Sequence, residues 1–367
     1  MKLYNSGTKL LMAFLTACIP LLYTVNVYAQ PLKVDVVGLN HDHVHNIMRQ
    51  FKKGEAVIVG IAEPDQQLVD RFKKRYQLPD SLFYKTITDM LQHTHPDAAL
   101  AYNAIADHIA VVEACAPKGI SVMVEKPLAT TVQQANRMAA LARQYHIQLL
   151  TNYETTWYSS NQQVFTMVKD SAIGVVKKMV VHMGHQGPKE IGCSADFLKW
   201  LTDPVKNGGG AVMDFGCYGA NLMTWLMDGN KPVAVTAITR HIKPAIYPYV
   251  DDDATILLEY ANGATGIIEA SWNWPFGIKD WEVFGEKSYL HALNASSLEQ
   301  RNRDTVGYFN VPVKQAIYTD NLPYLADVLR GKTKPGNDLS SLQNNLIVVQ
   351  ILEAAKQSAK EGRRIVL

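Results

Sequence analysis

Residues 120–127 read Ile120-Ser121-Val122-Met123-Val124-Glu125-Lys126-Pro127. The apolar, β-branched first part predicts a buried strand, and Pro127 must end it because proline has no N–H to donate to a sheet. The residue before a proline is forced out of helical geometry, which places Lys126 at the carboxyl end of the strand. Ligands bind at that edge of an open parallel sheet, so we expect Lys126 in a ligand site. The Lys126–Pro127 bond is also a candidate cis peptide.

Strands alternate with helices on both sides of this run, from Leu32 to about Thr151. This alternation predicts a doubly wound parallel sheet of the α/β class, forming a first domain over residues 30–153. We expect strands at 33–37, 57–62, 98–102, 120–124 and 148–151, and helices at 44–53, 66–76, 87–93, 106–117 and 131–145.

The pattern changes in residues 154–338, where period-two runs predict a second α/β domain with an open, mainly antiparallel sheet. Its strands are expected at 175–183, 232–240, 254–260, 265–272 and 281–284, with one helix at 211–227. The tail 339–367 carries a helical apolar pattern to residue 360. We expect its helix to pack back on the first domain.

The first 29 residues predict a secretory signal peptide. Two lysines precede an apolar run shorter than the roughly 20 residues of a membrane span, and Val27-Tyr28-Ala29 forms a small-x-small cleavage site. Leu15-Thr16-Ala17-Cys18 also fits a bacterial lipoprotein cleavage box, which we rank second because the residues after Cys18 stay apolar. We therefore expect a periplasmic protein without a membrane span.

Composition excludes several classes of function. Removing residues 1–29 takes away two lysines and no acid, so 36 basic residues become 34, equal to the 34 acidic ones. This balance argues against a protein that binds nucleic acid or a membrane surface. Cys115, Cys193 and Cys217 remain, an odd and scattered set that predicts no disulfide framework and no structural zinc site.

The first strand leads into Gly38-Leu39-Asn40-His41-Asp42-His43, at the position of a dinucleotide-binding glycine loop. Only the first glycine of Gly-x-Gly-x-x-Gly is present; Asn40 tolerates left-handed geometry, but His43 cannot replace a small residue. Glu63 follows the second strand, 25 positions after Gly38. An acid there binds the adenosine ribose and repels a 2′-phosphate, which favours NAD over NADP.

Histidines cluster next to this turn. His41 and His45 are spaced as on one helical turn and suggest a metal site. The start of a helix favours anions, however, so we rank contact of His41 and His43 with the cofactor first, surface histidines second and a metal third.

Further motifs follow along the chain: Asn103 and His108 after the strand at 98–102, Glu125-Lys126-Pro127, and the stretch from Gly208-Gly209-Gly210 to Tyr218. Together with Gly38 and Glu63, they resemble the family of glucose–fructose oxidoreductase, inositol dehydrogenase and rhizopine-catabolism proteins. The likeness covers essentially the whole chain after residue 29. It implies an N-terminal Rossmann domain, a nicotinamide cofactor held between the domains, and sugar or polyol oxidoreduction. It also implies a homodimer or homotetramer formed through the open sheet.

The resemblance implies three catalytic residues, Lys126, Asp214 and Tyr218. Tyr218 stands where many members have histidine and is a feature of the exported glucose–fructose oxidoreductase branch. Asp214 and Tyr218 are four apart, on one face of the expected helix. A phenol is a poor base near neutral pH, so we expect the Lys126 ammonium to lower its pKa. Which residue is the formal base stays open.

Further contacts follow for the cofactor and the sugar. Asn103, His108, Glu125 and Lys126 are expected on the cofactor side. The aromatic or imidazole side chains of Trp157, His182 and His185 are expected on the sugar side. A core or surface role is the alternative for each of them.

The leading hypothesis is a periplasmic NAD-dependent sugar or glycoside dehydrogenase that keeps its cofactor through turnover, acting at the 3-hydroxyl of a glycoside. A second is a glycosidase in which NAD is oxidant and reductant within one cycle. A third is a non-catalytic sugar- or metal-binding protein that uses the cluster His41–His45.

Overall fold

The computed structural model describes residues 1, 30–304 and 306–367. The expected signal peptide and Cys18 lie outside the described residues. No helix of the described part is long and apolar enough to cross a membrane. Within that part, Cys115, Cys193 and Cys217 are free thiols.

The first domain is built on a six-stranded parallel sheet in the order β3-β2-β1-β4-β5-β6, which is the Rossmann order. Two helical layers bury its apolar strands: α1, α2 and α10 on one face, and α3, α4, α5 and part of α11 on the other. The strands are β1 (Leu32–Val37), β2 (Ala56–Ala62), β3 (Phe83–Tyr84), β4 (Ala98–Ala101), β5 (Ser121–Glu125) and β6 (Leu149–Asn152). The helices are α1 (Val44–Lys52), α2 (Gln66–Tyr76), α3 (Ile87–His93), α4 (His108–Cys115), α5 (Val132–Gln144), α10 (Asn321–Leu329) and α11 (Leu342–Glu361).

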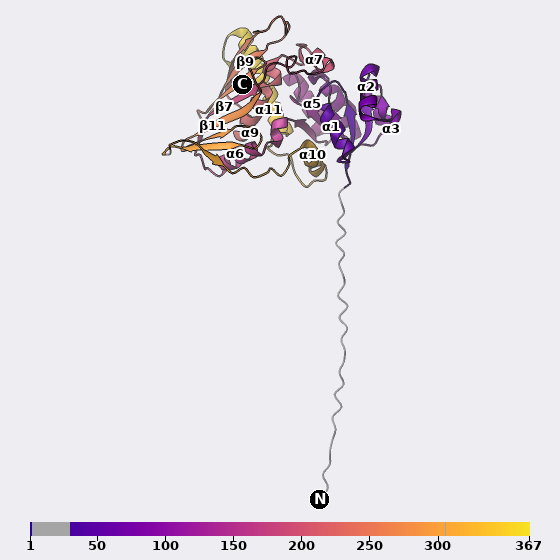
Figure 1. Cartoon of the computed structure of the whole chain (residues 1–367), viewed down its shortest axis with the longest axis horizontal. Coiled ribbons are helices and arrows are strands. Elements are labelled where there is room, and N and C mark those ends of the chain that lie inside the picture. Colours follow the sequence, from indigo (N-terminus) through magenta and orange to yellow (C-terminus); the bar gives the residue numbers. More distant parts are fainter. Residues whose placement is uncertain (2–29, 305) are drawn as a thin grey trace. The chain divides into compact units, whose positions relative to one another are not determined.

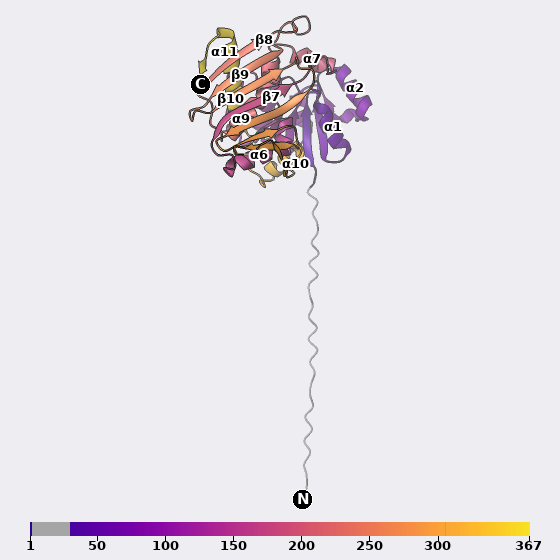
Figure 2. The same cartoon turned by 60° about the vertical axis from the view of Figure 1, so that its left-hand side comes forward.

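The second sheet has nine strands in the order β14-β13-β12-β11-β7-β10-β9-β8-β15, and Figure 2 shows its central strands side by side. It is mixed, because β7 and β10 run parallel while every other pair is antiparallel. Its strands are β7 (Val176–Gly184), β8 (Ala234–Arg240), β9 (Asp253–Glu259), β10 (Thr265–Ser271), β11 (Ile278–Gly285), β12 (Ser288–Ala292), β13 (Leu298–Asn302), β14 (Phe309–Val311) and β15 (Ile365–Val366).

One face of this sheet packs against helices and the other is open. The covered face carries the alternate apolar residues of the strands and meets α6 (Ser159–Lys169), α9 (Gly216–Leu226) and α11. Two short helices, α7 (Ala195–Leu201) and α8 (Ala211–Asp214), connect β7 to α9. Short 3-10 turns lie at Asp80–Leu82, Ile105–Asp107, Ala116–Lys118 and Glu154–Trp157.

The expected helix at 211–227 is interrupted. Helix α8 ends at Asp214 and α9 begins at Gly216, with Phe215 between them. Asp251 fixes the start of α8, since its carboxylate accepts the amides of Gly210 (2.8 Å) and Val212 (2.7 Å). A Cβ on Gly210 would lie 1.7 Å from the Asp251 carbonyl oxygen, so glycine is required there. Asp214 and Tyr218 therefore do not share one continuous helix.

The C-terminal tail joins the two domains. Helix α11 packs on α5 and β6 of the first domain, as expected, but also on α9 and β8 of the second. The Lys356 ammonium donates to the carbonyl oxygens of Thr130 (3.2 Å) and Gly208 (2.9 Å), one from each domain. The tail then adds β15 to the edge of the large sheet.

Candidate active site

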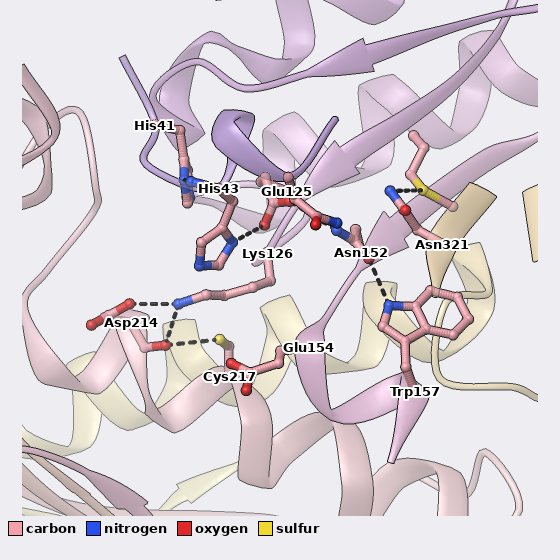
Figure 3. Close-up of polar contacts among 12 residues, drawn as sticks. His41, His43, Glu125, Lys126, Asn152, Glu154, Trp157, Asp214, Cys217 and Asn321 are labelled. Carbon is pink, nitrogen blue, oxygen red and sulfur yellow. Dashed lines mark hydrogen bonds and ion pairs between the residues drawn. The ribbon is translucent and has the colours of Figure 1, made fainter. Parts of the chain in front are cut away.

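The Lys126 ammonium lies where the two domains meet, at the carboxyl end of β5 (Figure 3). The Lys126–Pro127 peptide is cis, as the sequence suggested. The Nζ atom donates to the Asp214 carbonyl oxygen (2.8 Å) and pairs with Asp214 Oδ1 (2.5 Å). Trp272 Nε1 donates to the other carboxylate oxygen (2.9 Å). Lys126 and Asp214 are 6 % and 7 % exposed, so this is a buried ion pair.

Each member of the pair keeps the other charged. Burial lowers the pKa of Lys126, but Asp214 outweighs it and the pKa lies above its usual value. Burial likewise raises the pKa of Asp214, and the ammonium reverses the shift, so the acid's pKa is lowered. At neutral pH the site therefore holds an ammonium and a carboxylate.

Tyr218 contacts Lys126 through its ring. The ammonium lies 4.8 Å from the ring centroid, a cation–π contact. Burial, followed by the nearby acids Glu154 and Asp214, raises the pKa of Tyr218 well above 10. The expectation that Lys126 lowers this pKa is wrong, because Asp214 already neutralises the ammonium and the phenol is buried among acids.

A second lysine approaches the same ring and was not anticipated from the sequence. Lys279, on β11, lies 5.3 Å from the Tyr218 centroid and forms an ion pair with Glu154, which follows β6. This pair is more exposed than Lys126–Asp214, at 28 % and 47 % of the two side chains. Its partners are 125 positions apart, and no local pattern links them.

His185 also belongs to this centre. Its ring packs edge-on against Phe215, with centroids 4.9 Å apart, and burial lowers its pKa. The Gly187 N–H donates to His185 Nδ1 (2.9 Å), so the neutral imidazole carries its proton on Nε2. His185 is thus a hydrogen-bond donor beside Asp214 and Phe215.

His182 and Trp157 do not belong to the centre around Lys126 and Asp214. Met179, Val181 and Met183 of β7 face the core that contains Tyr218, so His182 points to the opposite, open face. There it pairs with Asp280 (2.7 Å), and the expectation that it lines the pocket with Tyr218 is wrong.

Trp157 instead lines a pocket of about 470 Å³ that reaches Glu125, the residue before Lys126, but not the ion pair itself. Its indole Nε1 donates to Asn152 Oδ1 (3.1 Å), and Asn152 donates to Glu125 Oε1 (2.9 Å). Trp157, Asn152, Glu125 and Glu154 all line this pocket. Burial raises the pKa of Glu125, but the contacts with His43 and Asn152 outweigh it and leave the pKa lowered.

The cofactor turn has one feature that requires glycine. Gly38 has φ +83°, and a Cβ on it would lie 2.7 Å from the Asn103 Cβ. Both oxygens of Glu63 accept backbone amides, from Leu39 (2.8 Å) and Asp65 (2.9 Å). Glu63 is therefore fixed at the end of β2, beside the turn.

Three buried polar atoms near the turn have no partner among the described residues: Asn40 Oδ1, Asn103 Oδ1 and His108 Nε2. Buried polar atoms are normally paired, so these three fit a polar ligand such as a dinucleotide. His108 Nδ1 bonds the Leu128 carbonyl oxygen (3.2 Å), and burial lowers its pKa to about 4, so Nε2 is a free acceptor.

Residues 194–200 lie against the turn, a contact that no pattern in the sequence predicts. The Ser194 amide donates to Asp42 Oδ2 (2.9 Å) and Trp200 Nε1 to the Asn40 carbonyl oxygen (3.0 Å). The His41 ring packs on Phe197 at 4.6 Å. Helix α7 thus closes one side of the cofactor turn.

The proposed His41–His45 metal pair is wrong. Helix α1 begins only at Val44, and His45 bonds the Tyr76 hydroxyl (2.6 Å) away from His41. A different trio, His41, His43 and Glu125, has ligand atoms within 4.8 Å of one another. In it, His43 Nδ1 lies 2.9 Å from Glu125 Oε2, and the His43 amide donates to His41 Nδ1 (3.1 Å).

Two family models match the chain. One, described as an oxidoreductase family with an NAD-binding Rossmann fold, matches residues 32–153. The other, the GFO/IDH/MocA C-terminal domain, matches residues 161–291.

Similar curated proteins include trans-1,2-dihydrobenzene-1,2-diol dehydrogenase of Xenopus laevis, 24 % identical over 58 % of this chain and 60 % of that protein. Rhizopine catabolism protein MocA of Rhizobium meliloti is 25 % identical over 57 % of this chain and 63 % of its own length. The chain thus matches less than two thirds of the length of these relatives.

Solved structures show the same fold. Aldose-aldose oxidoreductase from Caulobacter crescentus, complexed with glycerol, has a TM-score of 0.76 and 22 % identity, covering 92 % of this chain and all of that one. An inositol dehydrogenase homolog from Azotobacter vinelandii, complexed with NAD+, has a TM-score of 0.79 and 17 % identity, covering 92 % and 98 %. With both domains matched, the chain belongs to the GFO/IDH/MocA family of oxidoreductases and carries its NAD-binding Rossmann domain.

Proposed function

We propose that this protein is an exported, NAD-dependent oxidoreductase that interconverts a secondary hydroxyl and a ketone on a sugar or glycoside. Position 3 of a glycoside is the expected carbon. The observation that carries the proposal is the buried Lys126–Asp214 pair at the carboxyl end of β5. NAD, when bound, supplies the hydride acceptor, and Gly38, Glu63, Asn103 and His108 are the residues that would hold it.

Lys126 is the residue we assign to proton transfer. Its ammonium donates a proton to the carbonyl oxygen when a ketone is reduced, and its amine takes the hydroxyl proton when an alcohol is oxidised. Asp214 holds the ammonium in place, and His185 Nε2–H offers a second hydrogen bond to the same oxygen. Tyr218, whose pKa is raised well above 10, supports the lysine through its ring.

The preference for NAD over NADP rests on Glu63. Its buried carboxylate is fixed by two amides at the end of β2. A 2′-phosphate beside it would meet like charge. Glu63→Ser is expected to narrow the difference between the dissociation constants for NAD and NADP.

The proposal is tested first by mass spectrometry of the small molecule released when protein exported to the periplasm is denatured. Release of NAD is expected, together with NADH formation on a methyl glycoside. Hydrolysis of a nitrophenyl glycoside without net NADH would favour the glycosidase instead. Protein that neither carries nor binds a nicotinamide dinucleotide would contradict the proposal. N-terminal sequencing tests export, with Gln30 expected as the first residue.

We also propose a homodimer or homotetramer formed through the open face of the large sheet. Ile238, Leu257 and Phe284 are exposed there and are 51 %, 36 % and 36 % accessible. Strand alternation puts them on the side away from α9. Light scattering is expected to give a mass of at least two chains, and Leu257→Lys is expected to reduce it to one.

Metal binding is a second candidate, favoured by the His41, His43 and Glu125 trio. The neighbouring Lys126 ammonium opposes a cation there. Titration with zinc decides between the two: affinity that is lost in His43→Ala, in protein free of nicotinamide, would support the metal site.

A further inference from the structure

A second pocket, of about 430 Å³, lies next to the pocket that Glu125, Asn152 and Glu154 line. The two pockets share Trp157 as a wall. They also share the connection between β14 and α10, since Thr319 and Asp320 line the first pocket while residues 314–318 line the second. The pockets are therefore neighbours, separated by one indole and one stretch of chain.

One side of the second pocket is a fixed group of aromatic rings. The Trp157 and Tyr324 centroids are 5.6 Å apart, and Tyr318 stands edge-on to Tyr324 at 5.3 Å. Both phenols are held in place: Tyr324 donates to Asp338 (2.8 Å) and Tyr318 to Asp327 (3.0 Å). The rings present flat apolar faces at little entropic cost to a ligand.

Polar groups line the rest of the pocket. The side chains of Gln163 and Lys314 make no hydrogen bond or ion pair with the residues that the structure describes. The side chain of Gln162 makes only a long one, to the Thr156 carbonyl oxygen (3.5 Å). Thr156, which also lines the pocket, has a buried Oγ1 without a partner. Amides and an ammonium next to aromatic faces suit a ligand with hydroxyl groups around an apolar ring edge, such as a pyranose.

We propose that this pocket binds a further sugar unit of the substrate, so that a disaccharide or longer glycoside extends past Trp157 from one pocket into the other. This rests on the proposed function, because it takes the first pocket to hold the sugar that reacts. The shared wall favours a second part of the same substrate over an unrelated ligand.

The test compares two probes that differ by one glucosyl unit, methyl β-D-glucopyranoside and methyl β-D-cellobioside. Their dissociation constants are measured by calorimetry on the full chain, without turnover. The wild-type chain is expected to bind the cellobioside about tenfold more tightly, equivalent to about 1.4 kcal/mol. In Thr166→Trp, which places a bulky ring in the second pocket from the exposed face of α6, this difference should vanish.

Gln144→Trp is the matched control, since Gln144 is an exposed helical residue that lines neither pocket. It should keep the tenfold difference. Equal affinities in the wild-type chain, or the same affinities in Thr166→Trp as in wild type, would overturn the proposal. So would loss of the difference in both variants.

The calorimetric readout separates this proposal from the function on which it rests. If no sugar yields NADH but Thr166→Trp still removes the cellobioside preference, the second pocket stands and the dehydrogenase assignment falls. If methyl glycosides are oxidised but the cellobioside is not preferred, only the second pocket is wrong.

Discussion

Two lysines approach the ring of Tyr218, and each is paired with an acid. Lys126 of the first domain pairs with Asp214 of the second, whereas Lys279 pairs with Glu154, the first residue of its own domain. Lys126 and Asp214 are buried, whereas Lys279 and Glu154 are half exposed. A buried pair is costly to break, because the remaining charge has no solvent. An exposed pair is worth about 0–1 kcal/mol and can rearrange. We infer that the first pair builds the reaction centre and that the second has only a small effect on it.

Replacing the buried lysine should have the largest effect. Lys126→Met removes the proposed proton-transfer group, and we expect turnover to fall at least about 100-fold. The NAD dissociation constant should change by less than about threefold, because Gly38 and Glu63 remain. Steady-state kinetics and a cofactor titration measure the two. Normal turnover in this variant would remove Lys126 from the mechanism.

The second largest difference is expected in how much the protein loses in unfolding free energy when each of the two acids is replaced. Asp214→Asn leaves a buried ammonium without a countercharge and should cost about 3 kcal/mol of unfolding free energy. Glu154→Gln, the matched change in the exposed pair, should cost no more than about 1 kcal/mol. Denaturant unfolding at pH 7 compares them. Equal losses would mean that burial does not separate the two pairs.

The pH dependence of alcohol oxidation provides a third comparison. The pKa of Lys126 is raised, so its amine form is scarce at neutral pH and kcat/KM should rise with pH through the neutral and alkaline range. In Asp214→Asn the amine becomes easier to form, which should move this rise to lower pH by about one unit or more.

Tyr218→Phe is the control for that profile. If Lys126 carries the proton, the rise with pH should survive in Tyr218→Phe with reduced amplitude. Loss of the rise only in this variant would return the role of base to the tyrosine.

The smallest effect is expected at the exposed pair. Lys279→Met should change KM by only a few fold and leave kcat within about threefold of wild type, because Glu154 lines the pocket while Lys279 stays half exposed. Added salt should produce a similar change in wild type, since it screens exposed charges. A loss of turnover as large as that of Lys126→Met would show the two pairs to be equivalent.

The sequence predicted the first domain well, because its strands are continuous apolar runs and its ligand edge follows from Lys126 and Pro127. It could also have placed His182, since that residue falls between Met179, Val181 and Met183, which alternate toward the core. The pKa of Tyr218 could not be predicted, because burial and acids from distant segments determine it.

Other errors arise from contacts between segments that are far apart in the sequence. The start of the short helix α8 depends on Asp251, whose carboxylate accepts the amides of Gly210 and Val212 from about 40 positions along the chain. The contact of residues 194–200 with the cofactor turn joins two regions about 150 positions apart, and no periodic pattern reports such contacts.

Helix α11 has a mechanical consequence. It packs on both domains, and Lys356 ties the loop after Pro127 to the triple glycine. Hinge bending between the domains would have to break these bonds and separate Lys126 from Asp214. We infer that the two domains keep a fixed arrangement, so that a ligand enters a site that is already assembled. Deletion of the last 26 residues, from Leu342 onward, is therefore expected to weaken the contact between the domains.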